Sequence, residues 1–143
     1  MAKNYAMGIN HCLIDIPVWP TAKVSTQADA ERIAQHFKNI GEYLDIKTQV
    51  ILTKAEQPIG NGIGAVLQVR EVLRVLQQHK LRPHDLEQKA LELAAHIVVL
   101  CGLCETYDQA LEKVRLQLTS WAARAKMQEI ISSQEGKNPK IWS

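Results

Sequence analysis

The sequence predicts an α/β fold in which a short βαβ unit precedes a C-terminal helical bundle. Three observations indicate it: two apolar runs at 11–18 and 48–53, an amphipathic segment between them, and helical spacing over most of the remaining chain. A strand–helix–strand segment with a helix of this length is a βαβ unit, so the two short strands should be parallel and the crossover right-handed. We expect one domain over 1–143, with the βαβ unit at 11–53 and the helical region at 62–134.

The first strand is the run His-Cys-Leu-Ile-Asp-Ile-Pro-Val, in which Pro17 marks the end of the apolar stretch. Asp15 lies near its carboxyl end, where open α/β sheets gather ligands. The alternative, which we favour, is a structural role in which Asp15 accepts hydrogen bonds from the loop at 19–23.

Ser25 or Thr26 can cap the helix between the strands, and Asp29 substitutes for the acidic residue of a capping box. Gly41 lies inside this helix, where glycine costs about 1 kcal/mol relative to alanine. The apolar stripe comprises Ile33, Phe37, Ile40 and Leu44.

Four further segments show helical spacing, with Asp85 the expected cap of the second and Gly102 a left-handed cap at its end. Two parallel strands alone are barely stable, so neighbouring strands should come from sequence outside this chain or from a partner. The expected apolar positions are Val66, Val69, Leu73, Leu76, Leu86, Ala90, Leu93, Ile97, Leu100, Tyr107, Ala110, Leu111, Val114, Leu118, Met127, Ile130 and Ile131.

Composition excludes several classes of function. The formal net charge of +2 and the single Phe argue against nucleic-acid binding. The sequence contains no run of about 18 apolar residues, so it predicts no membrane-spanning helix. No signal-peptide pattern follows the first residues, so a cytoplasmic location is expected. The three cysteines lack scaffold spacing and predict reduced thiols.

Glycines at 60, 62 and 64 stand between the second strand run and the next helix. Their spacing fits neither a dinucleotide fingerprint nor a P-loop. Gly60, Gly62 and Gly64 remain candidates for a loop that faces a phosphate or ribose, because glycine permits close approach of the backbone. The alternative is tight strand-to-helix packing.

Three blocks carry a family resemblance. They are Leu-Ile-Asp-Ile-Pro-Val with Pro-Thr-Ala-Lys-Val at 13–24, Gln-Pro-Ile-Gly to Arg-Glu-Val-Leu at 57–73, and Lys-Met to Gln-Glu-Gly at 126–136. In this order they resemble blocks of the thymidine phosphorylase and pyrimidine-nucleoside phosphorylase family, with most similarity to its thymidine phosphorylase-like and AMP phosphorylase-like subgroup. The resemblance covers essentially the whole chain.

The resemblance implies an internal fragment of a nucleoside phosphorylase catalytic domain, because the family's phosphate loop, Lys-His-Ser-Thr-Gly-Gly, has no counterpart here. The whole protein would transfer a pentosyl group from a nucleoside to phosphate and release the free base. Thymidine is the first expectation for the substrate, and nucleoside monophosphates are the alternative. We expect no catalytic residue in this chain, and no activity from the chain alone.

The resemblance assigns three further residues. Residues 1–8 would end the base-binding helix, with Lys3 donating to a carbonyl of the departing base; the alternative is a solvated lysine. The Ala22 carbonyl and the Glu31 carboxylate would bind a potassium ion, although Glu31 can equally be a solvated first-turn acid. No organic cofactor is implied, and phosphate is the co-substrate.

Trp19 and Trp121 stand where the family pattern has glycine. If either position has a positive φ, tryptophan there costs about 1–2 kcal/mol. A non-catalytic, self-associating module is the rival interpretation, because helices with too few strands leave a sheet edge and apolar faces to pair between chains. Trp142 would serve such contacts, and we expect a homo-oligomer under either interpretation.

Cys101 and Cys104 have the spacing of redox and zinc motifs, but the chain has no second pair to complete a zinc site. We expect buried thiols packed at a helix end.

Overall fold

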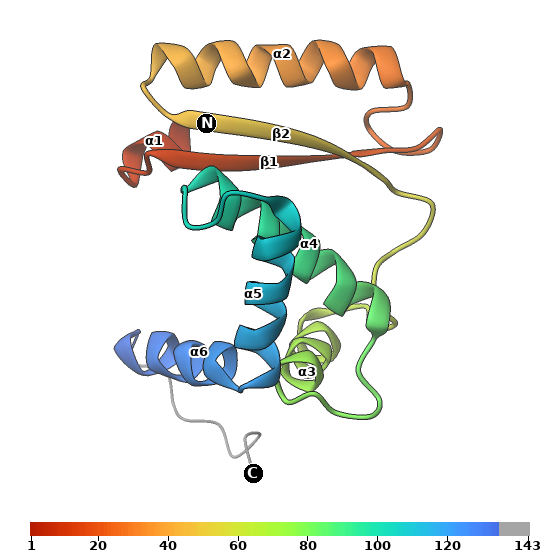
Figure 1. The fold of residues 1–143 in the computed structure, drawn as a ribbon. Helices are drawn as coiled ribbons and strands as arrows, with labels where there is room; N and C mark the ends of the chain where they lie inside the picture. Colours follow the sequence, from red (N-terminus) through yellow and green to blue (C-terminus); the bar gives the residue numbers. More distant parts are fainter. Residues whose placement is uncertain (135–143) are drawn as a thin grey trace. The chain divides into compact units, whose positions relative to one another are not determined.

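The computed structural model describes residues 1–134, which divide into two compact units. The sheet unit contains Met1–Pro58 and His96–Tyr107. The helical unit contains Ile59–Ala95 and residues 108–134. Figure 1 shows the elements of both units.

The sheet unit is built on two parallel strands, β1 (His11–Val18) and β2 (Lys47–Lys54). Their register places Ile14 beside Val50. Helix α2 (Gln27–Tyr43) connects them and runs along one face of the sheet (Figure 1). The α/β class and the parallel pairing predicted from the sequence are confirmed. Strand β1 has the predicted bounds, and β2 extends one residue beyond the predicted run at each end.

Helix α2 begins where the sequence predicts. Thr26 Oγ1 accepts the backbone N–H of Asp29 at 3.1 Å, and the Thr26 hydroxyl donates to Asp29 Oδ2 at 2.8 Å. This hydroxyl, followed by Arg32, lowers the pKa of the Asp29 carboxyl. Thr26 is therefore the cap, with Asp29 in the reciprocal position of a capping box.

Gly41 allows α2 to lie against β2. A Cβ at this position would be 2.2 Å from Thr48 Oγ1 and 2.9 Å from the Ile46 carbonyl oxygen. Glycine lowers the helix propensity here, but its missing Cβ is what permits the close packing of helix on strand. The buried apolar side chains of β1, α2 and the turn before β2 are Cys12, Ile16, Ala30 and Ile46.

Asp15 has the structural role that we favoured, but with a different partner. The Thr53 hydroxyl of β2 donates to Asp15 Oδ1 at 2.7 Å, so the carboxylate joins the two strands. The hydrogen bond is partly buried, which shelters it from water.

The helical unit is formed by α3 (Ala65–Leu76), most of α4 (His84–Leu100), most of α5 (Tyr107–Thr119) and α6 (Ala122–Ser133). Short helix α1 (Ala2–Ala6) belongs to the sheet unit. The core of the helical unit is a cluster of three buried side chains, Val75, Leu91 and Leu118. Five partly buried side chains pack against this cluster: Leu76, Leu86, Leu111, Val114 and Ala123.

The apolar face predicted for α3 is wrong in part. Val66 is 75% exposed and Val69 is 53% exposed, whereas Leu73 and Val75 are buried. The first half of α3 thus presents its apolar stripe to solvent, and burial begins only in its second half. Periodicity finds a stripe but does not tell which turns of it have a partner.

Two helix boundaries test the capping expectations. Gly102 has a φ of 71° after α4, which confirms the left-handed cap. Asp85 is not the cap of α4, because the helix already begins at His84. Its carboxylate instead accepts backbone N–H groups, one of them from a distant loop described below.

Trp121 precedes α6 in the left-handed conformation, with φ 68° and ψ 6°. This is the conformation that made a tryptophan in place of glycine costly. The Arg124 guanidinium stacks over the indole at 4.7 Å from the ring centroid, which offsets part of the cost. Trp19, by contrast, is not among the positive-φ residues, so the strain argument applies only to Trp121.

Changing Trp121 to glycine should therefore stabilise the protein by about 0.5–1 kcal/mol, because relief of the left-handed strain exceeds the lost stacking. Thermal unfolding followed by circular dichroism measures it. Trp121→Ala is the matched control, since it removes the indole but keeps a Cβ at the strained position. A rise in midpoint with alanine as large as that with glycine would contradict the strain explanation.

No helix among residues 1–134 is both long enough and apolar enough to cross a membrane. Trp142 lies outside the described residues.

Candidate functional site

The glycine turn, residues 60–64, is held by two carboxylates that follow it in the sequence. Gly60 has a φ of 74°, and its N–H donates to Asp85 Oδ2 of α4 at 2.8 Å. The next N–H, that of Asn61, donates to both oxygens of Glu71 on α3, at 3.0 Å and 3.1 Å. The turn is thus fastened to the middle of α3 and to the beginning of α4.

Glu71 is the one buried charged side chain among the described residues, with 7% of its surface exposed. A Cβ at position 60 would lie 2.3 Å from Glu71 Oε2, so both the positive φ and the space require glycine there. Neither Glu71 nor Asp85 was predicted as part of this turn. The signal was present as an acidic residue among the apolar side chains Val72, Leu73, Val75 and Leu76 of the second half of α3.

The other two glycines have different reasons. A Cβ on Gly62 would lie 2.8 Å from the Leu67 Cβ, so the turn passes directly over the first turn of α3. Gly64 precedes α3 with a φ of 107°, and a Cβ added there would meet no atom within 4 Å. Packing explains Gly62, conformation explains Gly64, and both explain Gly60.

The turn's chemistry follows from these bonds. A glycine turn before a helix can bind an anion through unpaired amide N–H groups. Here the N–H groups of Gly60 and Asn61 already donate to carboxylates. Whether Gly60, Gly62 and Gly64 face a ligand in a larger protein stays a prediction, and their packing role is evident in this unit.

The Gly60 N–H, ahead of the other backbone donors and His84, lowers the pKa of the Asp85 carboxyl. A depressed folded-state pKa gives stability that is present above the unfolded value and is lost as the pH falls through the folded value. We therefore expect the helical unit to lose stability below about pH 4 through Asp85. Urea unfolding at a series of pH values around and below 4 measures this loss of stability. In Asp85→Ala the free energy of unfolding should fall less steeply with decreasing pH, and an unchanged fall would contradict the assignment to Asp85.

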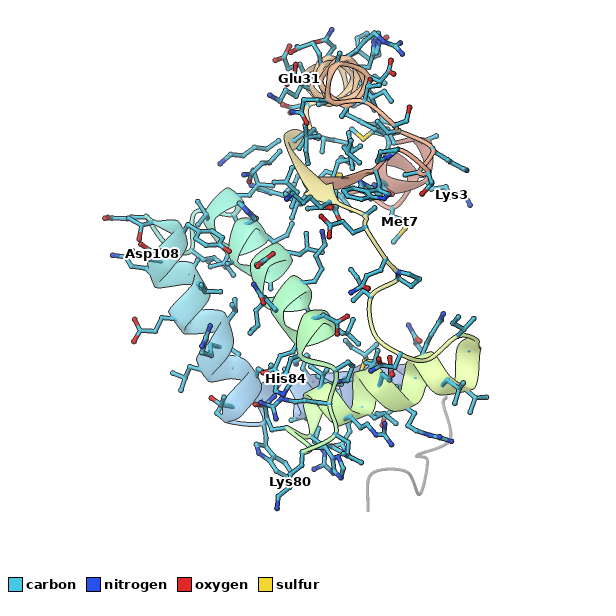
Figure 2. All side chains as sticks on the ribbon, turned by 90° about the vertical axis from the view of Figure 1, so that its right-hand side faces the viewer. Lys3, Met7, Glu31, Lys80, His84 and Asp108 are labelled. Atoms are coloured by element: carbon cyan, nitrogen blue, oxygen red, sulfur yellow. The ribbon has the colours of Figure 1, made fainter. Side chains whose placement is uncertain are left out.

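The three residues assigned by resemblance lie on separate elements of the sheet unit. Figure 2 shows Lys3 on α1 and Glu31 on α2. Both are exposed, and Glu31 Oε1 accepts a hydrogen bond from Gln27 Nε2 at 3.0 Å. Ala22 lies in the loop after β1, where its N–H donates to the Trp19 carbonyl oxygen at 2.9 Å.

A potassium ion would need more oxygens than these positions provide. Among residues 1–134 no group of three or more His, Cys, Asp or Glu side chains is placed to hold a metal ion. The Ala22 carbonyl and the Glu31 carboxylate are at most part of such a site, and they stay predictions.

The sheet unit contains one polar cluster that sequence reasoning missed. Gln49 Nε2 of β2 lies 3.3 Å from His96 Nδ1, and the centroids of the His96 and Tyr107 rings are 4.9 Å apart.

The two cysteines that follow α4 differ in exposure. Cys101 is exposed and Cys104 is half-buried. The expectation of two buried thiols is wrong, because Cys101 directly follows the last residue of α4 and is exposed, and Cys104 lies in the loop before α5 and is only half-buried.

Known proteins are similar to this chain along nearly its entire length. The chain is 41% identical over 140 residues to a protein of Bradyrhizobium sp. strain BTAi1 named "Putative thymidine phosphorylase". Proteins with the same name from Rhodopseudomonas palustris strain BisB18 and Ralstonia nicotianae are 41% and 38% identical. No family model matches the chain.

The match to the Bradyrhizobium protein covers 94% of this chain and 26% of that relative. The chain thus spans about a quarter of the length of the curated relatives that it matches. Identity at this level over so much of the chain shows that it shares ancestry with these proteins. Over the segment that it spans, this chain is thus a homologue of proteins named putative thymidine phosphorylase.

Proposed function

We propose that this chain supplies one segment of a thymidine phosphorylase-like pentosyltransferase. The complete protein would transfer the pentosyl group of a nucleoside to phosphate and release the free base. The observation that carries the proposal is 41% identity across 94% of the chain to a relative bearing that name. Thymidine is the proposed substrate and phosphate the co-substrate.

Phosphorolysis of a nucleoside needs several positioned charged groups, and this segment would provide only part of them. Phosphate attacks the anomeric carbon as the glycosidic C–N bond breaks, and the bonding electron pair leaves with the base. Stabilisation of the departing base and of the cationic sugar is electrostatic, so it depends on positioned charges. Lys3, exposed on α1, is the proposed donor to a carbonyl oxygen of the base.

The sheet unit would provide the scaffold for this chemistry. Its parallel strands end together at Val18 and Lys54, and ligands of α/β sheets bind beyond the carboxyl ends of strands. The loop that carries Ala22 follows β1 at that edge. The potassium ion, when bound there through the Ala22 carbonyl and Glu31, would add positive charge near the same edge.

A chimera tests the function directly. The matching segment of the Bradyrhizobium protein is replaced by residues 1–134 of this chain, and thymine release from thymidine and phosphate is followed by absorbance. We expect phosphate-dependent release, reduced at least about ten-fold by Lys3→Ala, because an ionic hydrogen bond to the leaving group is lost. A parallel chimera with Trp121→Gly guards against a folding failure. A folded chimera without phosphorolysis, beside an active parent, would overturn the proposal.

The 143-residue chain alone should release no thymine above the blank, because the phosphate-binding loop of the family is not in its sequence. Purified protein, thymidine and inorganic phosphate are sufficient for the assay. Release that depends on phosphate would show that the segment holds a complete phosphate site, contrary to this expectation.

A further inference from the structure

The bonds at the glycine turn point beyond packing. We infer that Glu71 and Asp85 form a carboxylate clamp that fixes residues 60 and 61 and closes the turn's leading N–H groups to anionic ligands. The inference concerns this chain alone and does not depend on the proposed function.

The clamp reaches across the helical unit rather than along a single turn. Asp85 is 25 residues from Gly60, and Glu71 is 10 residues from Asn61. Each bond therefore ties the turn to a different helix, α4 in one case and α3 in the other. Movement of residues 60 and 61 as a pair requires both bonds to break.

The clamp also restricts a segment that would otherwise be conformationally free. Glycine has more backbone freedom to lose than any other residue, so three glycines in five residues need strong fixed partners. Bonds between amides and ionised carboxylates are roughly twice as strong as neutral ones. The bond to Glu71 is further sheltered, because only 7% of that residue is exposed.

Charge gives the clamp its chemical consequence. An anion that approached the N–H groups of Gly60 and Asn61 would have to displace a carboxylate and would then lie beside a second one. Like charges repel strongly in a partly buried setting. If the complete protein binds phosphate, these two N–H groups do not provide the site while the clamp is closed.

Amide hydrogen exchange on the ¹⁵N-labelled 143-residue chain tests the clamp. Asp85→Ala should speed exchange at Gly60 about ten-fold, and Glu71→Met should do the same at Asn61, because each removes one ionic acceptor. Glu71→Gln keeps a neutral acceptor and should give a smaller change. Glu112→Gln, an exposed acid on α5, is the matched control and should leave both rates unchanged.

The clamp is wrong if Gly60 and Asn61 in the unaltered chain exchange as fast as unstructured amides, or if Asp85→Ala leaves Gly60 unchanged. Asp85 is exposed, so that variant stays informative even if the buried Glu71 variants fail to fold. Titration with inorganic phosphate is the second measurement. We expect no saturable shift of the two amide resonances, and a saturable shift would overturn the closure to anions.

Discussion

Gly41→Ala should lower the free energy of unfolding of the sheet unit by about 2 kcal/mol. In an exposed helix interior the same change stabilises by about 0.5–1 kcal/mol, so the expected sign is reversed. The reason is the added Cβ, which would lie 2.2 Å from Thr48 Oγ1 and 2.8 Å from the Thr48 Cβ. Urea unfolding monitored by circular dichroism measures the change.

A double-mutant cycle separates this clash from propensity. Thr48→Ala removes the hydroxyl and, with it, the 3.0 Å bond to the Ile46 carbonyl, so it should destabilise on its own. Combined with Gly41→Ala it should cost less than the sum of the single changes, since the worst contact is gone. Additive costs, or a stabilising Gly41→Ala, would show that α2 and β2 are not in close contact.

Local signals predicted the sheet unit well because its determinants are local. Apolar runs, a Thr26–Asp29 cap and a connection of helical length are read from neighbouring residues, and a helical connection between two adjacent strands implies parallel pairing. The register, which places Ile14 beside Val50, was not predicted. The need for Gly41, by contrast, depends on how closely a helix approaches a strand, which no sequence pattern reports.

The helical unit was harder for a physical reason. Spacing on α3 predicts an apolar stripe from Val66 to Leu76, but burial depends on which turns meet α4 and α5, and only the second half does. Glu71 escaped prediction because a carboxylate on a helix face is ordinarily solvated. Asp85 was assigned to the wrong donor, since a residue after proline suggests a cap and its contact with Gly60 is long-range.

The candidate site divides in the same way. Lys3, Ala22 and Glu31 came from resemblance alone, and they stay predictions until a complete cleft is assayed. The glycines came from the sequence itself, and the structure gives each a separate physical reason. Trp121 lies between these cases, because resemblance marked the position and the left-handed backbone then explained why glycine suits it.

Leu118→Ala should have the largest effect in the helical unit, lowering the free energy of unfolding by about 2–4 kcal/mol. Leu118 is 7% exposed and packs in the cluster with Val75 and Leu91. It also lines an apolar groove of about 320 Å³, so truncation enlarges an existing hollow that neighbouring helices do not fill. Lost transfer free energy and poor closure of the hollow act in the same direction.

Leu116→Ala on the same helix is the matched control for this change, because Leu116 is 61% exposed. Its effect should remain within about 0.5 kcal/mol, as for most surface substitutions. Urea midpoints of both variants, with unchanged slopes, give the comparison directly. Equal losses of free energy of unfolding at the two positions would mean that α5 does not turn its Leu118 face toward the core. A different face of α5 would then have to pack in the helical unit.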